Sequence, residues 1–319
     1  MMNQSTARAL RTMRACATAA LACAAALPAA QAACQYKQLG AIPATWVDRR
    51  LVIEGRVNNA PLKMAVDTGT TWTTLSSVVA ARLNVPQGVH AVVWSGVDGE
   101  RSGVSAKLDQ LSIGRFQWHD TNVVVSWQPA GAPDVQVGAN LLLEHDVELD
   151  GRRIVFYEPA GCDDAALGYW ADDVPWVPTG TVTPRDQRTT ITVQVNGQPM
   201  RALVDSGSTA TILDSAVASR LGVGTAPSGK AGGSGGHAVA VLDSIAIGPE
   251  IIKHARIQLG DIRETGAQRP IAEPVDVILG ADFLQSHRLL FAASQRRMYF
   301  TYLGGEVFHA PEAEPVASR

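Results

Sequence analysis

The sequence is poor in aromatic residues, in cysteine and in clustered positive charge. Aromatic residues make up 6% of its 319 residues, four residues are cysteine, and the formal net charge is −3. No basic run occurs beyond the N-terminal region, which argues against a nucleic-acid-binding protein. Beyond that region no stretch reaches about 18 uninterrupted apolar residues, so we expect no membrane span in the mature chain.

Motifs of several enzyme classes are also missing. The seven histidines are scattered, without the HExxH pattern or another paired spacing. No Gly-Lys-[Ser/Thr] phosphate loop is present, and the glycine run at residues 232–236 is not followed by a helical pattern. The same glycine run contains a G-x-S-x-G match, but without a following helical pattern it is not the strand-to-helix elbow of a serine hydrolase. We therefore expect a protein that uses neither a metal ion nor another cofactor.

Residues 1–32 have the pattern of a signal peptide. Arg8, Arg11 and Arg14 form a positive segment, a short apolar run follows, and residues 30–32 read Ala-Gln-Ala, which matches an A-x-A cleavage site. The apolar run is too short for a permanent membrane anchor. We therefore expect an exported protein, either periplasmic or extracellular.

Export makes the two cysteines of the mature chain informative. Cys34 and Cys162 remain after the leader is removed, and a pair in an oxidising compartment usually forms a disulfide. In the alternative hypothesis, cleavage after Ala33 leaves Cys34 as a lipidated N-terminus. Gln31 argues against it, because a lipoprotein signal favours an aliphatic residue at that position.

The most informative feature that is present is an acidic motif that occurs twice. Asp-Thr-Gly-Thr at residues 67–70 returns as Asp-Ser-Gly-Ser at residues 205–208, at an offset of 138 positions. Each copy follows an apolar strand pattern with a turn at Asn58-Asn59 or Asn196-Gly197. Two structural turns that remain from a duplication are the alternative interpretation, but the matched apolar pattern favours paired carboxylates.

The rest of the repeat predicts two mostly β units. After each acidic motif comes a short helical pattern, at residues 76–83 and 214–221, with Ser76 and Asp214 as N-caps. We expect a leader at residues 1–32 and a first lobe at residues 33–160. A linker rich in Pro, Gly and Asp follows at residues 161–184, then a second lobe at residues 185–303 and a frayed tail at residues 304–319.

The order of motifs resembles the aspartic proteases. Residues 202–208 read Ala-Leu-Val-Asp-Ser-Gly-Ser, and residues 277–284 read Val-Ile-Leu-Gly-Ala-Asp-Phe-Leu. The resemblance implies an all-β fold of two tandem retropepsin-like β-barrel lobes in one chain, related by a pseudo-twofold axis with the cleft between them. It also implies that Asp67 and Asp205 are a catalytic dyad that shares one proton and activates a water molecule.

By the same resemblance, the six other motif residues support the dyad: Thr68, Gly69, Thr70, Ser206, Gly207 and Ser208. The glycines are expected to let each turn close tightly and aim backbone N–H groups at the carboxylates. The last hydroxyl of each motif is expected to donate to the outer carboxylate oxygens. The first hydroxyls are expected to reach across to the opposite turn. In the alternative interpretation, these hydroxyls only cap their own turns by hydrogen-bonding to nearby backbone groups.

Two glycine-containing hairpins are candidates for flaps over the cleft, at residues 92–104 and 228–237. The flap and substrate residues expected from them are Trp94, Gly96, Gly233 and Gly235. In the alternative interpretation, Trp94 is an ordinary half-buried strand residue without a role at the substrate. Two departures from the family pattern occur: neither flap contains tyrosine, and Gln136 replaces an aliphatic residue before Val137-Gly138.

The functional hypothesis is an exported aspartic endopeptidase that acts as a monomer, an internal pseudo-dimer, on a polypeptide substrate. A non-catalytic peptide-binding or envelope-assembly protein that keeps the fold is the first alternative. A homodimer, in which each lobe pairs with its copy in another chain, is the second.

Overall fold

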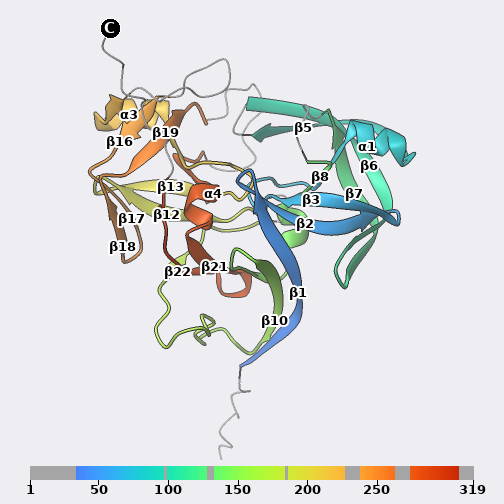
Figure 1. The fold of residues 1–319 in the computed structure, drawn as a ribbon, viewed down its shortest axis with the longest axis horizontal. Helices are drawn as coiled ribbons and strands as arrows, with labels where there is room; N and C mark the ends of the chain where they lie inside the picture. Colours follow the sequence, from blue (N-terminus) through green and yellow to red (C-terminus); the bar gives the residue numbers. More distant parts are fainter. Residues whose placement is uncertain are drawn as a thin grey trace, which may run out of the picture. The chain divides into compact units, whose positions relative to one another are not determined.

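A computed structural model describes residues 34–96, 99–127, 133–183, 186–226, 238–262 and 274–308, all within one compact unit, Cys34–Arg319. The expected signal peptide lies outside the described residues. Strands dominate, which confirms the all-β prediction (Figure 1). The α-helices are short: α1 (Ser77–Arg82), α2 (Ala139–Leu142), α3 (Ser215–Leu221) and α4 (Ala281–Leu284).

Each lobe is built around the β-hairpin that the repeat predicts. The hairpins are β2 (Arg50–Val57) with β3 (Ala60–Val66) and β12 (Thr190–Val195) with β13 (Gln198–Val204). The turn residues Asn58, Asn59, Asn196 and Gly197 all have positive φ, as a two-residue turn with the twist of paired strands requires. The repeat therefore fixes the hairpin register in both lobes.

Two short strands follow each hairpin and, together with its second strand, position the acidic turn. They are β4 (Thr74–Ser76) and β8 (Val135–Val137) in lobe one, and β14 (Ile212–Asp214) and β20 (Val277–Leu279) in lobe two. In lobe one, β8 pairs in parallel with β3 and antiparallel with β4. In lobe two, β20 pairs in the same way with β13 and β14. Matching pairing at the two sites confirms the tandem-lobe prediction.

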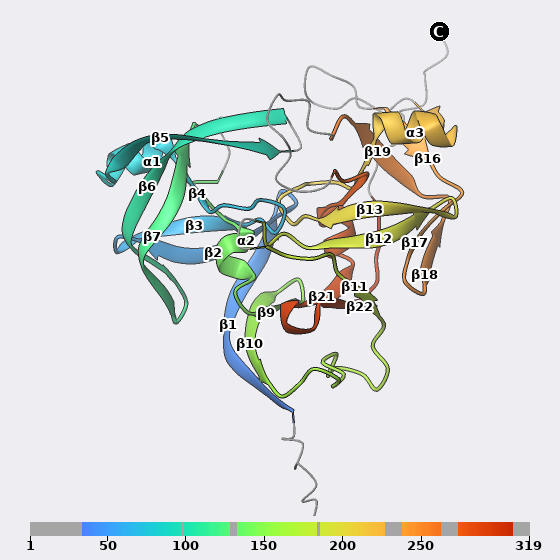
Figure 2. The same ribbon diagram turned by 180° about the vertical axis from the view of Figure 1, so that it is seen from behind.

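Further strands complete each lobe (Figure 2). Lobe one adds three long strands, β5 (Gln87–Gly96), β6 (Gly99–Ile113) and β7 (Phe116–Ser126). Lobe two adds five shorter ones, β15 (Gly224–Ala226), β16 (Val239–Val241), β17 (Ser244–Ile247), β18 (Glu250–Lys253) and β19 (Arg256–Gly260). β4 pairs in parallel with β7, and β14 pairs in parallel with β19, so the common plan extends into these strands.

The closing strands of the two lobes join in one sheet. They are β1 (Gln35–Val47), β9 (Asp146–Leu149), β10 (Arg153–Ala160), β11 (Trp176–Pro178), β21 (His287–Ala292) and β22 (Arg297–Tyr302). β21 of lobe two pairs antiparallel with β9 of lobe one. Across this seam Arg288 pairs with the fully buried Glu148, with 2.6 Å between Nη2 and Oε1. The two expected lobes therefore share backbone hydrogen bonds and a charged pair.

The segment expected as a linker is packed rather than open. Leu167 and Val174 are buried, and they join a cluster with Tyr157 of β10 and Tyr299 of β22. The Pro, Gly and Asp content of this segment therefore marks the absence of long strands and helices, and not an absence of packing. The tail differs from expectation in the same way at its start, because Phe308 is buried in the main core. The remainder, residues 309–319, lies outside the described residues.

Candidate active site

The two repeated aspartates sit in matching turns directly after β3 and β13. Asp67 N–H donates to the carbonyl of Val137 (3.0 Å), and Asp205 N–H donates to the carbonyl of Leu279 (2.9 Å). Both side chains are buried, with exposed fractions of 8% and 4%. The parallel pairing of each hairpin with its neighbouring strand thus anchors both turns in the same way.

Backbone N–H groups hold one oxygen of each carboxyl. In lobe one, Gly69 and Thr70 donate to Oδ1 of Asp67 at 3.1 and 2.9 Å. In lobe two, the equivalent N–H groups of residues 207 and 208 donate to Oδ1 of Asp205 at 2.8 and 3.2 Å. These donors fix the orientation of each carboxyl and favour its charged form.

The glycine of each turn contacts the carboxyl of the opposite lobe. A methyl group on Gly69 would overlap the carboxyl of Asp205, and one on Gly207 would overlap the carboxyl of Asp67. Neither glycine has the positive φ that would make its conformation unfavourable for other residues. The structure therefore adds a reason for glycine that the sequence analysis missed, namely the close approach of the two turns.

The first hydroxyl residue of each motif reaches across between the lobes, as the resemblance implied. Thr68 Oγ1 donates to the carbonyl of Val204 (2.8 Å) and accepts from the N–H of Ser206 (3.0 Å). Ser206 Oγ donates to the carbonyl of Val66 (2.8 Å) and accepts from the N–H of Thr68 (3.1 Å). All four bonds are buried, so they link the two turns in a fixed geometry.

The expected hydroxyl bond from Ser208 to its carboxylate is wrong. Ser208 Oγ donates instead to the carbonyl of Ala210 at 2.8 Å, and a hydroxyl has a single proton to donate. The backbone N–H of the same residue takes the role that the side chain was expected to have. For Thr70 the N–H has this role too, and a bond from its hydroxyl to Asp67 stays a prediction.

The pKa values of the two carboxyls respond to burial and to each other. Burial raises the pKa of Asp67 well above its usual range, and the charge of Asp205 and a hydrogen bond with it raise it further. Burial also raises the pKa of Asp205, although N–H donors, the bond with Asp67 and the charge of Arg188 act in the opposite direction. Two coupled buried carboxyls of this kind favour a state with one shared proton.

A second layer of polar residues supports both turns, and the sequence analysis did not assign it a role. In lobe one, the N–H and Oγ1 of Thr73 donate to Oδ1 of Asn140 at 2.8 and 3.0 Å. In lobe two, the N–H and Oγ1 of Thr211 donate to Asp282 at 3.0 and 2.6 Å. The threonines share the 138-position offset of the aspartates, and this spacing is the signal that could have identified them.

The residues expected in the flaps are placed only in part. Trp94 and Gly96 lie in β5, where they pair with Arg101 and Gly99 of β6, so the expected lobe-one hairpin is present. The lobe-two flap residues Gly233 and Gly235 lie outside the described residues. Roles for these four residues at the substrate stay predictions.

A disulfide joins Cys34 and Cys162, with 4.5 Å between their Cα atoms, as the cysteine pattern predicted. It ties the start of β1 to the segment that follows β10. Within the described part of the chain, no group of three or more His, Cys, Asp or Glu side chains is arranged to hold a metal ion. No helix among the described residues is long and apolar enough to cross a membrane.

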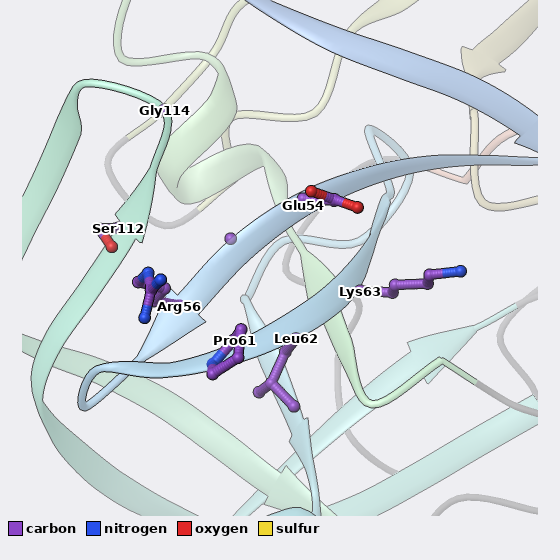
Figure 3. Close-up of a pocket in the computed structure, with 8 residues that line it drawn as sticks. Glu54, Arg56, Pro61, Leu62, Lys63, Ser112 and Gly114 are labelled. Atoms are coloured by element: carbon purple, nitrogen blue, oxygen red, sulfur yellow. The ribbon is translucent and has the colours of Figure 1, made fainter.

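A surface groove of about 430 Å³ lies on lobe one and is lined by residues other than the two aspartates (Figure 3). Its charged residues Glu54, Arg56 and Lys63 are spread around the groove and point in different directions. Arg56 is engaged by the backbone of the β2–β3 turn, since its Nη1 donates to the carbonyl of Asn59 at 2.8 Å. These side chains do not converge on one point, so they form no second site.

Comparisons with known proteins agree with this geometry. The family model described as aspartyl protease matches residues 53–141 and 191–283, once in each lobe. The crystal structure of an aspartic proteinase from Irpex lacteus superposes with a TM-score of 0.54 at 13% identity, over 84% of this chain and 97% of that chain. At this identity the likeness shows the fold. A search of curated proteins finds no match.

Proposed function

Because the chain belongs to the aspartyl protease family, we propose that it is an endopeptidase in which Asp67 and Asp205 form the catalytic dyad. One observation carries the proposal: two buried carboxyls lie on equivalent turns that approach each other so closely that each carboxyl contacts the glycine of the opposite turn. Two carboxyls this close do not both ionise readily, so the pair keeps one proton and has an acid and a base side by side.

The pair has the parts that peptide hydrolysis needs. The ionised carboxyl takes a proton from a water molecule while the water oxygen forms a bond to the substrate carbonyl carbon. The other carboxyl donates its proton to the carbonyl oxygen, which gives a tetrahedral diol. The pair then protonates the amide nitrogen as the C–N bond breaks and one hydroxyl proton returns to the carboxyls. The products are a free carboxyl group and an amine.

A non-catalytic peptide-binding or envelope-assembly protein with this fold is the second candidate. Such a protein would need the folded lobes but not a shared proton. The buried hydroxyl links made by Thr68 and Ser206 and the close glycine contacts hold two carboxyls together at a cost in desolvation. Retention of this arrangement favours the enzyme.

The pattern of residues 1–32 and the disulfide between Cys34 and Cys162 together support export to the periplasm or the extracellular space. A monomer is sufficient for activity in this proposal, because one chain supplies both aspartates. Light scattering on the purified protein tests the monomer, and N-terminal sequencing of the exported protein tests cleavage of the leader.

Hydrolysis of an unfolded protein tests the activity. The full chain, expressed with its leader and purified, is incubated with fluorescein-labelled casein from pH about 3 to about 7, with and without pepstatin. The expected result is cleavage that is strongest below neutrality and is blocked by the inhibitor. A folded protein that releases no peptide at any pH would contradict the enzyme and favour the binding protein.

A further inference from the structure

Next to the dyad, the two lobes differ at one cross-strand pair. In lobe one, Thr74 of β4 pairs with Gln136 of β8. At the equivalent place in lobe two, Ile212 of β14 pairs with Ile278 of β20. The backbone pairing is the same, so the difference lies in the side chains alone. Lobe one has two polar groups where lobe two has two aliphatic ones.

Gln136 uses its amide to contact the dyad. Its Nε2 lies 3.4 Å from Oδ2 of Asp67 and donates to it. The hydroxyl of the buried Thr74 donates to Oε1 of the same amide at 3.1 Å. Because the hydroxyl occupies the amide oxygen, the amide nitrogen is directed at the carboxyl. The residue that departs from the family pattern thus reaches the reactive group.

Asp205 has an apolar neighbour at the same position. Ile278 is buried with Leu203 and Ile262, and Ile212 packs against this cluster. An isoleucine side chain has no group that donates a hydrogen bond. Asp67 therefore receives a side-chain donor on Oδ2 in addition to its two backbone donors on Oδ1, and the residue at position 278 cannot supply the equivalent donor to Asp205.

Resting on the proposed function, we propose that Gln136 is a positioning residue that holds Oδ2 of Asp67 and moves the working pH range of the dyad downward. A donor to a carboxylate stabilises its charged form relative to the protonated acid. The contact is long for a hydrogen bond, so its effect is modest. Thr74 contributes indirectly, because it sets the direction of the amide.

The sign of the effect follows from the groups around Asp67. The titratable group that faces it from lobe two is Asp205, whose charge raises the pKa of Asp67. The charge of Arg188 acts on Asp205 in the opposite direction. The Gln136 amide opposes the effect of Asp205, because it favours the ionised form of Asp67. Without this donor, the protons of the pair should be lost at higher pH.

The test compares pH–rate profiles for casein cleavage by the full chain. Gln136→Met keeps the length of the side chain but removes the amide, and it should shift the profile upward by about half a pH unit. Thr74→Val removes the hydroxyl that orients the amide and should shift it in the same direction by less. KM should stay within about twofold, since the change acts on protonation and not on substrate contacts.

Two further variants make the result specific to this contact. Ile278→Met places the same new side chain at the equivalent position of lobe two, and it should leave the profile unchanged. Gln136→Leu repeats the loss of the donor with a different shape and should reproduce the shift. An unmoved profile in the Gln136 variants overturns the proposal. A shift to lower pH overturns it as well, because the amide would then be accepting a hydrogen bond from the protonated carboxyl of Asp67.

A titration without turnover separates this inference from the proposed function. The carboxyl carbons of ¹³C-labelled aspartate are followed by NMR in the wild type and in Gln136→Met, with assignment by the Asp67→Asn variant. If casein is never cleaved, the proposed endopeptidase activity is wrong. An upward shift of the Asp67 titration in Gln136→Met would still support the hydrogen bond from Gln136 to Asp67. Titration curves that coincide overturn the inference whatever the activity.

Discussion

Lobe one has a threonine and a glutamine beside its acidic turn, whereas lobe two has a pair of isoleucines at the same place. The helix caps differ in a similar way. Asp214 accepts two N–H bonds from the first turn of α3, while Ser76 makes no side-chain bond to α1. What the lobes share is the backbone pairing, the aspartate, first hydroxyl and glycine of each motif, and the threonine that supports each turn. The common geometry therefore constrains few side chains, and the rest are free to make the carboxyls unequal.

The largest effect should come from removing either carboxyl. Asp67→Asn and Asp205→Asn should each lower casein cleavage by at least ~10³-fold, because the shared-proton mechanism needs both groups despite their different surroundings. Circular dichroism should show an intact fold. Asp48→Asn, in an exposed turn with positive φ that asparagine tolerates, is the matched control and should retain activity. Near wild-type turnover in either dyad variant would remove that residue from the mechanism.

The disulfide between Cys34 and Cys162 is the next difference between the lobes, because it joins the two ends of lobe one and has no counterpart among the described residues of lobe two. Replacing Cys34 and Cys162 together by serine should lower the free energy of unfolding by about 4 kcal/mol in the chain-entropy treatment of a crosslink across 128 positions. Urea unfolding of both proteins measures the loss. Mass spectrometry of the wild type should find no free thiol in the exported chain, and two free thiols or a lipidated Cys34 would contradict the disulfide.

The dyad should make the wild type less stable as the pH rises. Its carboxyls have raised pKa values in the folded state, so their contribution to stability is complete below the ordinary aspartate pKa and is lost as pH increases above it. Asp67→Asn and Asp205→Asn should therefore raise Tm at pH about 7 by a few degrees and give no gain at pH about 3. Calorimetry at both pH values checks this. An equal gain at both would point to packing rather than charge.

The smallest expected effect concerns Thr70 and Ser208, the last hydroxyl residues of the two motifs. Ser208→Ala should cost about 1 kcal/mol of stability and leave the pH–rate profile in place, because its hydroxyl donates to the carbonyl of Ala210. Thr70→Ala tests the equivalent position in lobe one. An upward shift in that variant alone would show that the Thr70 hydroxyl reaches Asp67, and a shift in Ser208→Ala would contradict the bond seen here.

The repeat predicted the parts of the fold that depend on local chemistry. Asn58-Asn59 and Asn196-Gly197 are residues that tolerate positive φ, so both hairpins could be located from the sequence. The apolar strand before each aspartate indicated a buried turn, and the common offset indicated that the turns are equivalent. The fold class and the disulfide followed from the same kind of pattern, and the structure confirms both.

Other parts depend on contacts between distant residues and leave no local pattern. The pairing of β21 with β9 follows from how the closing strands of the lobes meet, which no motif encodes. Ser208 could donate either to its carboxylate or to a nearby carbonyl, and geometry alone decides between them. The role of Gln136 was present in the sequence as a departure from a pattern, but its direction toward Asp67 needs the hydroxyl of Thr74 in three dimensions.

The seam between β9 and β21 has a consequence for chains that are divided between the lobes. A cut in the segment between them would allow the halves to separate, which exposes the edge of β9 in one half and of β21 in the other, and the N-terminal half would carry the fully buried Glu148 without Arg288. An open edge favours pairing with any available strand, and a buried charge without its partner destabilises the fold. The halves should therefore reassemble with each other as complementing fragments when they are folded together, and they should aggregate when each is made alone.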